Sequence, residues 1–139
     1  MDPNCTEDCN EVIACSYKCW VFNSKMVKIP QGENTDGSLN VGGKRVYAPP
    51  VIADLDNNGK IDLCVAAKTT VYCWEWNSVT RTFVKRNGFP KTLPGISTDE
   101  EIRGMAAGDV NLDGYIEVFL ATTDSEIQTF AYTPSGAVF

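Results

Sequence analysis

The chain contains two acidic segments that repeat at a fixed spacing, and an aromatic segment that repeats at nearly the same spacing. Asp54-Leu-Asp-Asn-Asn-Gly-Lys-Ile-Asp62 returns 55 residues later as Asp109-Val-Asn-Leu-Asp-Gly-Tyr-Ile-Glu117. Cys19-Trp-Val-Phe-Asn-Ser24 returns 54 residues later as Cys73-Trp-Glu-Trp-Asn-Ser78, and more loosely after another 56 as Thr129-Phe-Ala-Tyr-Thr-Pro134. Because two unrelated features keep one register, the sequence predicts a structural repeat of about 55 residues.

Within one repeat the residue pattern is that of short β-strands. We expect strands over residues 51–53, 61–67, 70–76 and 82–85. Lys68 and Thr69 form a tight turn between the middle two strands. No segment longer than about ten residues has the apolar stripe of a helix. The prediction is an all-β chain of four-stranded units, and such a unit repeated radially is a β-propeller blade.

The predicted units divide the chain into four parts. We expect a cysteine-rich segment with the outer strands of a partial blade (1–30), a glycine-rich loop (31–45), a first full blade (46–90) and a second, incomplete blade (91–139). This makes about two and a half blades, whereas a closed propeller needs at least about four. Open sheet edges and uncovered blade faces favour pairing. We therefore expect the chain to be part of a larger propeller or to associate with copies of itself.

Six cysteines and no histidine limit the chemistry open to the chain. No Cys-x-x-Cys pair is present, so the spacing favours disulfides, and with them an oxidising compartment, over a zinc or redox site. Free buried thiols in a cytosolic protein are the alternative. Counting inward from the turn at Lys68 and Thr69 places Cys64 opposite Cys73, where cross-strand side chains are closest. We predict a Cys64–Cys73 disulfide.

The first four cysteines allow three pairings, and the sequence leaves them open. Phe119 and Thr129 occupy the equivalent positions of the next unit and are ten residues apart. The same spacing applied to the first unit pairs Cys9 with Cys19 and leaves Cys5 for Cys15. Asn4-Cys-Thr6 also matches a glycosylation sequon, which matters only in a secreted protein.

The acidic segments have the ligand pattern of a calcium loop. Calcium takes about six to eight oxygen ligands at about 2.3–2.6 Å, and a tight loop supplies them from alternate positions, with a glycine at position 6 for the turn. The predicted ligands of the first loop are Asp54, Asp56, Asn58, the carbonyl of Lys60, and Asp62. Those of the second loop are Asp109, Asn111, Asp113, the carbonyl of Tyr115, and Glu117. The sequence predicts two calcium sites, and the alternative is a pair of Asx turns without metal.

The surroundings of the loops separate them from an EF-hand. An EF-hand needs a bidentate Glu at loop position 12 between two helices. Position 12 is Val65 in the first loop and Leu120 in the second, and both lie within predicted strands. The same difference rejects a dockerin-type loop, which residues 108–114 otherwise resemble.

Placed between strands, the loops resemble the FG-GAP or VCBS repeats of integrin-α-type β-propellers. The motifs that carry the resemblance are Asp54-x-Asp-x-Asn-Gly-x-x-Asp62 and Asp109-x-Asn-x-Asp-Gly-x-x-Glu117. Gly88-Phe-Pro90, followed by Leu93-Pro-Gly95, also resembles the linker of bacterial VCBS repeats. The resemblance covers roughly residues 19–133. It implies a calcium-stabilised propeller in a secreted or cell-surface protein, with calcium in the loop between the first two strands of a blade.

Composition and motifs also narrow the function. The net charge of -6 argues against a nucleic-acid or anionic-membrane partner, and no apolar run reaches the ~18 residues of a membrane span. Without histidine or a Gly-x-Ser-x-Gly elbow, and with its paired carboxylates assigned to metal, the chain is not expected to be an enzyme. We expect a binding, adhesion or scaffolding module with a protein or glycan partner at the cell surface. The alternatives are a structural subunit of a surface assembly or filament, and the non-catalytic part of a polysaccharide-active enzyme.

Three further features have structural rather than functional interpretations. An aromatic residue at every second strand position is what packing between blades requires, although it also suits sugar stacking. These residues are Trp20, Phe22, Trp74, Trp76, Phe130 and Tyr132. Asp99-Glu-Glu101 is expected to be a solvated loop. Asn34-x-Asp-Gly37 resembles half a calcium loop but has Gly32 at position 1, so it is also expected to be a loop without metal.

Overall fold

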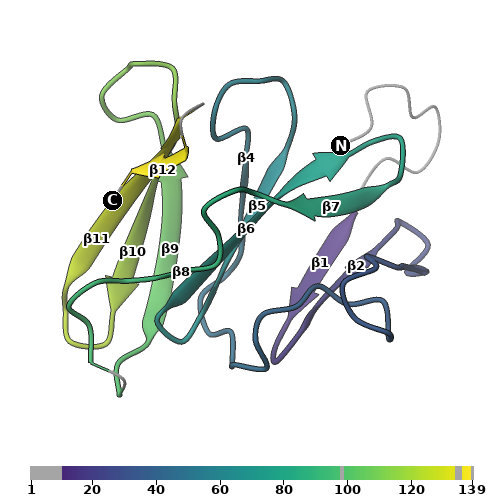
Figure 1. Cartoon of the computed structure of the whole chain (residues 1–139), viewed down its shortest axis with the longest axis horizontal. Coiled ribbons are helices and arrows are strands. Elements are labelled where there is room, and N and C mark those ends of the chain that lie inside the picture. The colour runs from purple at the N-terminus through teal and green to yellow at the C-terminus, as the bar shows by residue number, and fades with distance from the viewer. Residues whose placement is uncertain (1–10, 98, 134–135, 139) are drawn as a thin grey trace.

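The computed structural model describes residues 11–97, 99–133 and 136–138, and this part of the chain consists of strands and loops (Figure 1). The strands form three antiparallel sheets that lie side by side (Figure 1). No helix within the described ranges is long and apolar enough to cross a membrane. The all-β prediction is therefore confirmed for the described residues.

The central sheet forms as the sequence predicts, within one residue at each strand end. It contains β4 (Val51–Ala53), β5 (Asp62–Ala67), β6 (Thr70–Asn77) and β7 (Thr82–Lys85), and the short strand β8 (Lys91–Thr92) pairs with the start of β6. Ala67 pairs with Thr70 across the tight turn, in which Lys68 has a φ of 54°. Cys64 pairs with Cys73, and the predicted disulfide joins them.

The second repeat forms a four-stranded sheet of its own. Its strands are β9 (Ile102–Gly108), β10 (Glu117–Thr122), β11 (Ile127–Thr133) and β12 (Gly136–Val138), hydrogen-bonded in the order β12-β11-β10-β9. Phe119 lies opposite Thr129, as the repeat predicts. The sequence predicts an incomplete second blade over residues 91–139, and the structure supplies its fourth strand as the three-residue strand β12.

The first sheet has three strands, β1 (Val12–Cys15), β2 (Cys19–Phe22) and β3 (Lys28–Ile29). The pairing of Cys9 with Cys19 and of Cys5 with Cys15 is wrong, because a disulfide joins Cys15 to Cys19. The β1–β2 turn follows Cys15 directly, so the strand register places Cys15 opposite Cys19. In the other two hairpins the turn lies further from the equivalent positions. Cys5, Cys9 and the Asn4 sequon lie outside the described residues.

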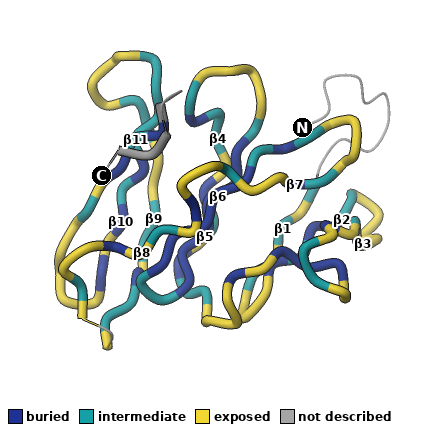
Figure 2. Tube along the Cα trace, viewed as in Figure 1, coloured by how far each residue is buried: buried dark blue, intermediate teal, exposed yellow. Residues whose placement is uncertain are grey.

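The central sheet lies between the other two sheets, and most of β5 and β6 is buried (Figure 2). Its two faces belong to two different buried clusters, because alternate residues of a strand point to opposite sides. On one side Leu63, Val65 and Trp74 pack against Val21 and Leu39 of the first sheet and the loop after it. All five of these side chains have no solvent exposure. The first sheet therefore packs against the central sheet through a continuous apolar layer.

The other face of the central sheet packs against the second repeat. Cys64 and Val71 on this face belong to one buried cluster with Val118, Leu120 and Phe130 of the β9–β12 sheet. Because β5 and β6 are covered on both sides, their apolar residues run without polar interruption, whereas strands with one covered face alternate. The structure therefore has two hydrophobic cores, one on each face of the central sheet.

The aromatic residues predicted to pack between sheets do so in two of the three units. Trp74, Trp76, Phe130 and Tyr132 are all buried. In each case the aromatic face of a sheet packs on the sheet that precedes it in the sequence. Trp20 and Phe22 are only half-buried, because in β2 it is Cys19 and Val21 that face the central sheet. The aromatic face of the first sheet thus points away from the other two sheets.

Candidate metal centre

The first acidic loop joins β4 to β5 and is closed by its first and last carboxylates. Asp54 accepts hydrogen bonds from the N–H groups of Asn58, at 3.0 Å, and Gly59, at 2.7 Å. Gly59 has a φ of 83°, a conformation that glycine adopts without steric cost. The N–H of Leu55 donates to Oδ2 of Asp62 at 3.0 Å. The glycine at position 6 thus makes the predicted turn, and the carboxylates at positions 1 and 9 hold the loop closed.

The second acidic loop, between β9 and β10, has the same hydrogen bonds at the same positions. Asp109 accepts from the N–H groups of Asp113, at 3.2 Å, and Gly114, at 3.0 Å. The N–H of Val110 donates to Oε2 of Glu117 at 3.0 Å, as Leu55 does to Asp62. The two loops are therefore one structural motif used twice, and their sequence register is also their structural register.

Position 7 is also equivalent in the two loops. The N–H of Lys60 donates to the Asn58 side-chain oxygen at 2.8 Å, and the N–H of Tyr115 donates to Asp113 at 2.9 Å. The loops lie at the same end of their sheets (Figure 1) and touch, since the N–H of Ile116 donates to the carbonyl of Leu55 at 3.0 Å. A change in one loop can therefore reach the other through a single backbone hydrogen bond.

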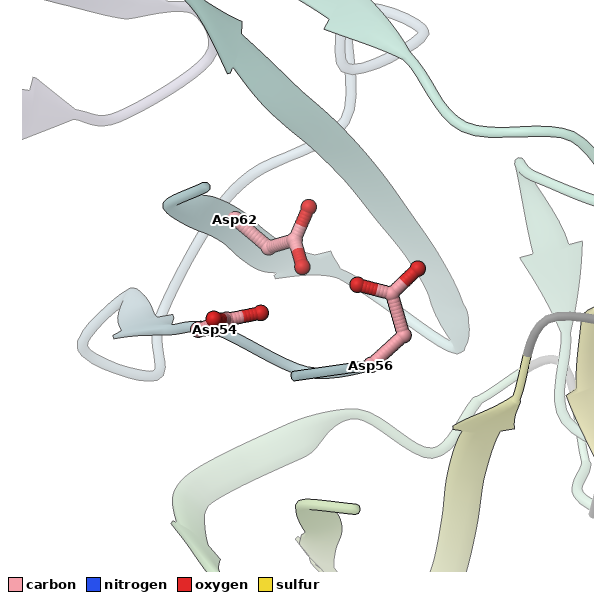
Figure 3. Close-up of side chains that lie close together, drawn as sticks. All are labelled: Asp54, Asp56 and Asp62. Carbon is pink, nitrogen blue, oxygen red and sulfur yellow. The ribbon is translucent and has the colours of Figure 1, made fainter. Parts of the chain in front are cut away.

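Three of the predicted ligands converge in the first loop. One carboxylate oxygen from each of Asp54, Asp56 and Asp62 lies within 4.8 Å of the other two. Figure 3 shows the three carboxylates directed toward the space between them. Asp62 is only 1% exposed, so at least one of these charges is removed from water. Three anionic groups at this spacing repel one another strongly unless a cation compensates them.

The predicted ligands of the second loop do not converge in the same way. Asn111 and Asp113 are exposed, and the Asn111 amide donates to Asp113 at 3.0 Å and to Glu117 at 3.3 Å. Within the described ranges, the acids at 54, 56 and 62 are the only group of three that gathers closely enough to hold an ion. A neutral amide therefore takes the place between carboxylates that a cation would take.

Arg86, just after β7, is a residue of the first loop's environment that the sequence did not reveal. Its Nη1 and Nη2 donate to the two oxygens of Asp56 at 2.8 and 3.0 Å. Its Nε and Nη2 donate to the two oxygens of Asp62, both at 2.7 Å. The register of the β6–β7 hairpin could have indicated Arg86. It places Lys85 opposite Trp74, and so brings the residue after Lys85 beside β6 and near the loop.

The electrostatics of this group favour the charged form of Arg86, whereas the pKa of the buried Asp62 carboxyl is raised overall. Burial alone would lower the pKa of Arg86, but its hydrogen bonds to Asp62 and Asp56 outweigh burial and raise it. Burial raises the pKa of Asp62, and the guanidinium of Arg86 opposes that rise. The guanidinium also lies 4.5 Å from the ring centroid of Tyr132, which is a cation–π contact. The loop is therefore a compensated ion cluster.

Glu75 on β6 extends this cluster outward. It accepts hydrogen bonds from the Asn58 amide at 2.9 Å and from Nζ of Lys60 at 2.7 Å, and it lies 3.3 Å from Arg86. Burial raises the pKa of Glu75, but its hydrogen bonds to Lys60 and Asn58 outweigh burial and lower it overall. The side chains of Asn58 and Lys60 are therefore tied to the sheet beside the loop.

The donor set of both loops fits a hard divalent cation. Each loop offers three carboxylates and one amide oxygen from side chains, and each has a backbone carbonyl at position 7. Oxygen-only sites of this kind suit calcium or magnesium, and the flexible loop with many donors suits calcium better. No nitrogen or sulfur ligand is among the predicted residues, so the set does not suit zinc or copper.

The other two acidic segments are loops, as predicted. Asp99 is exposed, and Glu101 forms an ion pair with Arg103 at 2.7 Å. Asp36 lies in an irregular segment, where Lys18 and Ser38 donate to it and hold its pKa well below the usual range. Neither segment belongs to the cluster of converging carboxylates.

Comparison with known families agrees with the loop geometry. Residues 54–120 match the model of the FG-GAP-like repeat, a stretch that begins at the first acidic loop and runs through the second into β10. Comparisons with curated proteins and with solved structures found no match. The two disulfides and the repeat point to an extracellular domain of the adhesion type. Residues 54–120 are thus similar to the FG-GAP-like repeat, in agreement with the resemblance carried by the two acidic motifs.

Proposed function

We propose that the chain is a calcium-stabilised module of a secreted or surface-exposed β-propeller, which binds or scaffolds partners rather than catalysing a reaction. The observation that carries this proposal is the convergence of Asp54, Asp56 and Asp62 within 4.8 Å, in a loop of the matched repeat region. The identical backbone scaffold of the second loop supports a second site there.

Calcium explains why the chain concentrates charge in these loops. Without calcium, the carboxylates of the second loop repel one another and oppose the folded backbone, whereas Arg86 offsets part of the charge of the first loop. A bound calcium ion removes that repulsion and contributes its binding free energy to folding, because an unfolded loop does not present the ligands together. The ligands in this proposal are the ten predicted residues, with Lys60 and Tyr115 acting through their carbonyl oxygens.

The packing of the sheets supports the propeller arrangement. Four-stranded antiparallel sheets stacked face to face are the units of a propeller. Each of the two observed contacts joins the aromatic face of one sheet to the face of the sheet before it. This order gives the stack a direction, as a radial array of blades requires. Rigid loops at one end of such an array form a surface on which a protein or glycan partner can bind.

Calcium binding should be measured by isothermal titration on the whole chain and on Asp54→Ala and Asp109→Ala variants. Two sites are expected in the unaltered chain, and each substitution should remove one of them. Asp36→Ala is the matched control, because Asp36 lies outside both loops and should leave both sites intact. Absence of calcium binding to the folded, unaltered chain at millimolar calcium would refute the proposal.

A structural subunit that associates with its own copies is the second candidate. It is favoured by the two end faces of the stack, on which no other sheet of the described residues packs. Trp20 and Phe22 lie on one of them, and an apolar hollow that includes Ala106, Phe119 and Ile127 lies on the other. Ile127 is 72% exposed. In the observed contacts, the aromatic face of one sheet packs on the opposite face of the sheet before it. The two end faces are one of each kind, so they could pack on each other between two copies of the chain.

Sedimentation velocity in calcium tests this second candidate. Assemblies larger than the 15.2 kDa chain are expected, and Phe119→Ser should shift them toward monomer. Val79→Ser is the control, because Val79 is 92% exposed in the β6–β7 turn and lies on neither face. A compact monomer at all concentrations would contradict self-association.

A further inference from the structure

We propose that Arg86 is a built-in counter-cation of the first acidic loop. Calcium must then compete with Arg86 for Asp56 and Asp62, and the two loops differ in calcium affinity and in their need for calcium. The second loop is the tighter site, and the first loop keeps its structure without metal. This inference rests on the proposed calcium binding, since it concerns how the chain's own residues modulate it.

The guanidinium engages every oxygen of the two carboxylates. Four hydrogen bonds of 2.7–3.0 Å join Nε, Nη1 and Nη2 to both oxygens of Asp56 and both oxygens of Asp62. Such two-pronged contacts are the strongest that arginine makes with carboxylates. A calcium ion bound to the same oxygens would draw on their charge and repel the guanidinium at short range. Binding of one cation therefore weakens binding of the other.

Arg86 is held in place by both neighbouring sheets. Its N–H donates to the carbonyl of Cys73 at 2.9 Å, which continues the β6–β7 ladder. Its guanidinium lies over Tyr132 of β11, 4.5 Å from the ring centroid. Its side chain is 9% exposed, as is that of Asp56, while that of Asp62 is fully buried. An ion pair shielded from water in this way is screened little by salt.

No comparable cation lies at the second loop among the described residues. Within the described residues, no lysine or arginine forms an ion pair with Asp109, Asp113 or Glu117. The amide of Asn111 is the group that donates to Asp113 and Glu117, and it carries no net charge. Three carboxylates thus remain uncompensated in the second loop, whereas the first loop already holds its positive charge.

This difference also explains the geometry of the two loops. The carboxylates converge in the first loop, where Arg86 binds two of the three. They do not converge in the second loop, although its backbone hydrogen bonds are the same. The convergence of the first loop is therefore a property of the arginine as well as of the sequence motif.

The two sites can be followed separately by NMR. The N–H groups of Gly59 and Gly114 donate to the first carboxylate of their own loops, so each amide resonance reports on one loop. In a calcium titration of the whole chain, Gly114 should respond at lower calcium than Gly59. In Arg86→Gln, the midpoint for Gly59 should move to calcium concentrations lower by roughly ten-fold or more, because the competing charge is gone.

Control variants separate this effect from a general loss of structure. Arg103→Gln also removes an arginine that pairs with a carboxylate, Glu101, and lies over a tyrosine, Tyr47, but near neither ligand set. It should leave both midpoints unchanged. Asp109→Asn should abolish the calcium-dependent shift of Gly114 and leave the Gly59 midpoint at its value in the unaltered chain. If Arg86→Gln is unfolded without metal, calcium should refold it, since calcium supplies the missing charge.

Each outcome decides the proposal. An unchanged Gly59 midpoint in Arg86→Gln would overturn the competition. A higher midpoint would also overturn it, and would show that Arg86 helps to position the calcium ligands. An Arg86→Gln chain that stays unfolded at saturating calcium would overturn it as well. If neither the Gly59 nor the Gly114 resonance of the folded chain shifts on addition of calcium, the proposed calcium binding is refuted, and this inference is refuted with it.

Discussion

Replacing Phe130 by alanine should reveal the packing between the central sheet and the second repeat. Phe130 on β11 is 1% exposed and belongs to the buried cluster that joins the two sheets. Its ring lies 5.6 Å from that of Phe89, centroid to centroid. Phe→Ala in a buried site lowers the free energy of unfolding by about 3–5 kcal/mol, because apolar contacts are lost and a cavity remains. For a domain of this size that corresponds to a fall of roughly 10–20 °C in the melting temperature.

Phe119→Ala is the matched control for this prediction. Phe119 lies on the adjacent strand β10 but faces the other side of the sheet, because Val118 is the partner of Phe130 and Phe119 the partner of Thr129. It is half-buried, and its replacement should cost about 1 kcal/mol. Both variants should be melted, followed by circular dichroism, at concentrations where the melting temperature does not depend on concentration. Equal costs, or a larger cost for Phe119→Ala, would refute the assigned packing face.

Two further substitutions test local features of the fold. Replacing Cys64 and Cys73 by alanine should lower the free energy of unfolding by about 2–3 kcal/mol, because the disulfide closes a short loop, and non-reducing peptide mapping that joins either cysteine elsewhere would contradict the strand register. Gly42→Ala should destabilise the chain by at least ~1 kcal/mol more than Gly43→Ala in urea unfolding. Both glycines have φ near +65°, but a Cβ on Gly42 would lie 2.6 Å from Oη of Tyr72, whereas a Cβ on Gly43 meets nothing within 4 Å, so equal costs would contradict this close approach.

The features that the sequence predicted well are local or repeated. The hairpin at Lys68 was predictable because its strands are adjacent in sequence and the turn fixes their register, which placed Cys64 opposite Cys73. The equivalence of the acidic loops was predictable because the same residue types recur at the same positions. Phe119 and Thr129 followed from the repeat alone, and the structure pairs them.

The features that escaped prediction depend on departures from the repeat or on contacts between distant segments. Cys15 pairs with Cys19 because the first hairpin has its turn in a different place, which a repeat spacing cannot reveal. Arg86 reaches Asp62 from 24 residues away, and only the assembled sheet brings the two together. The repeat predicts a core position for Trp20 by analogy with Trp74, yet no sheet among the described residues covers it.

The most direct test of the account is the melting temperature of the chain in calcium and in EGTA. At a calcium concentration 100 times the dissociation constant, one site adds about 2.7 kcal/mol to the free energy of unfolding. For a domain of this size, removing that contribution lowers the melting temperature by roughly 10 °C. Asp109→Ala should reproduce most of the EGTA effect and Asp54→Ala a smaller part, because Arg86 already compensates the first loop. An unchanged melting temperature in EGTA would contradict the claim that calcium in the acidic loops stabilises this fold.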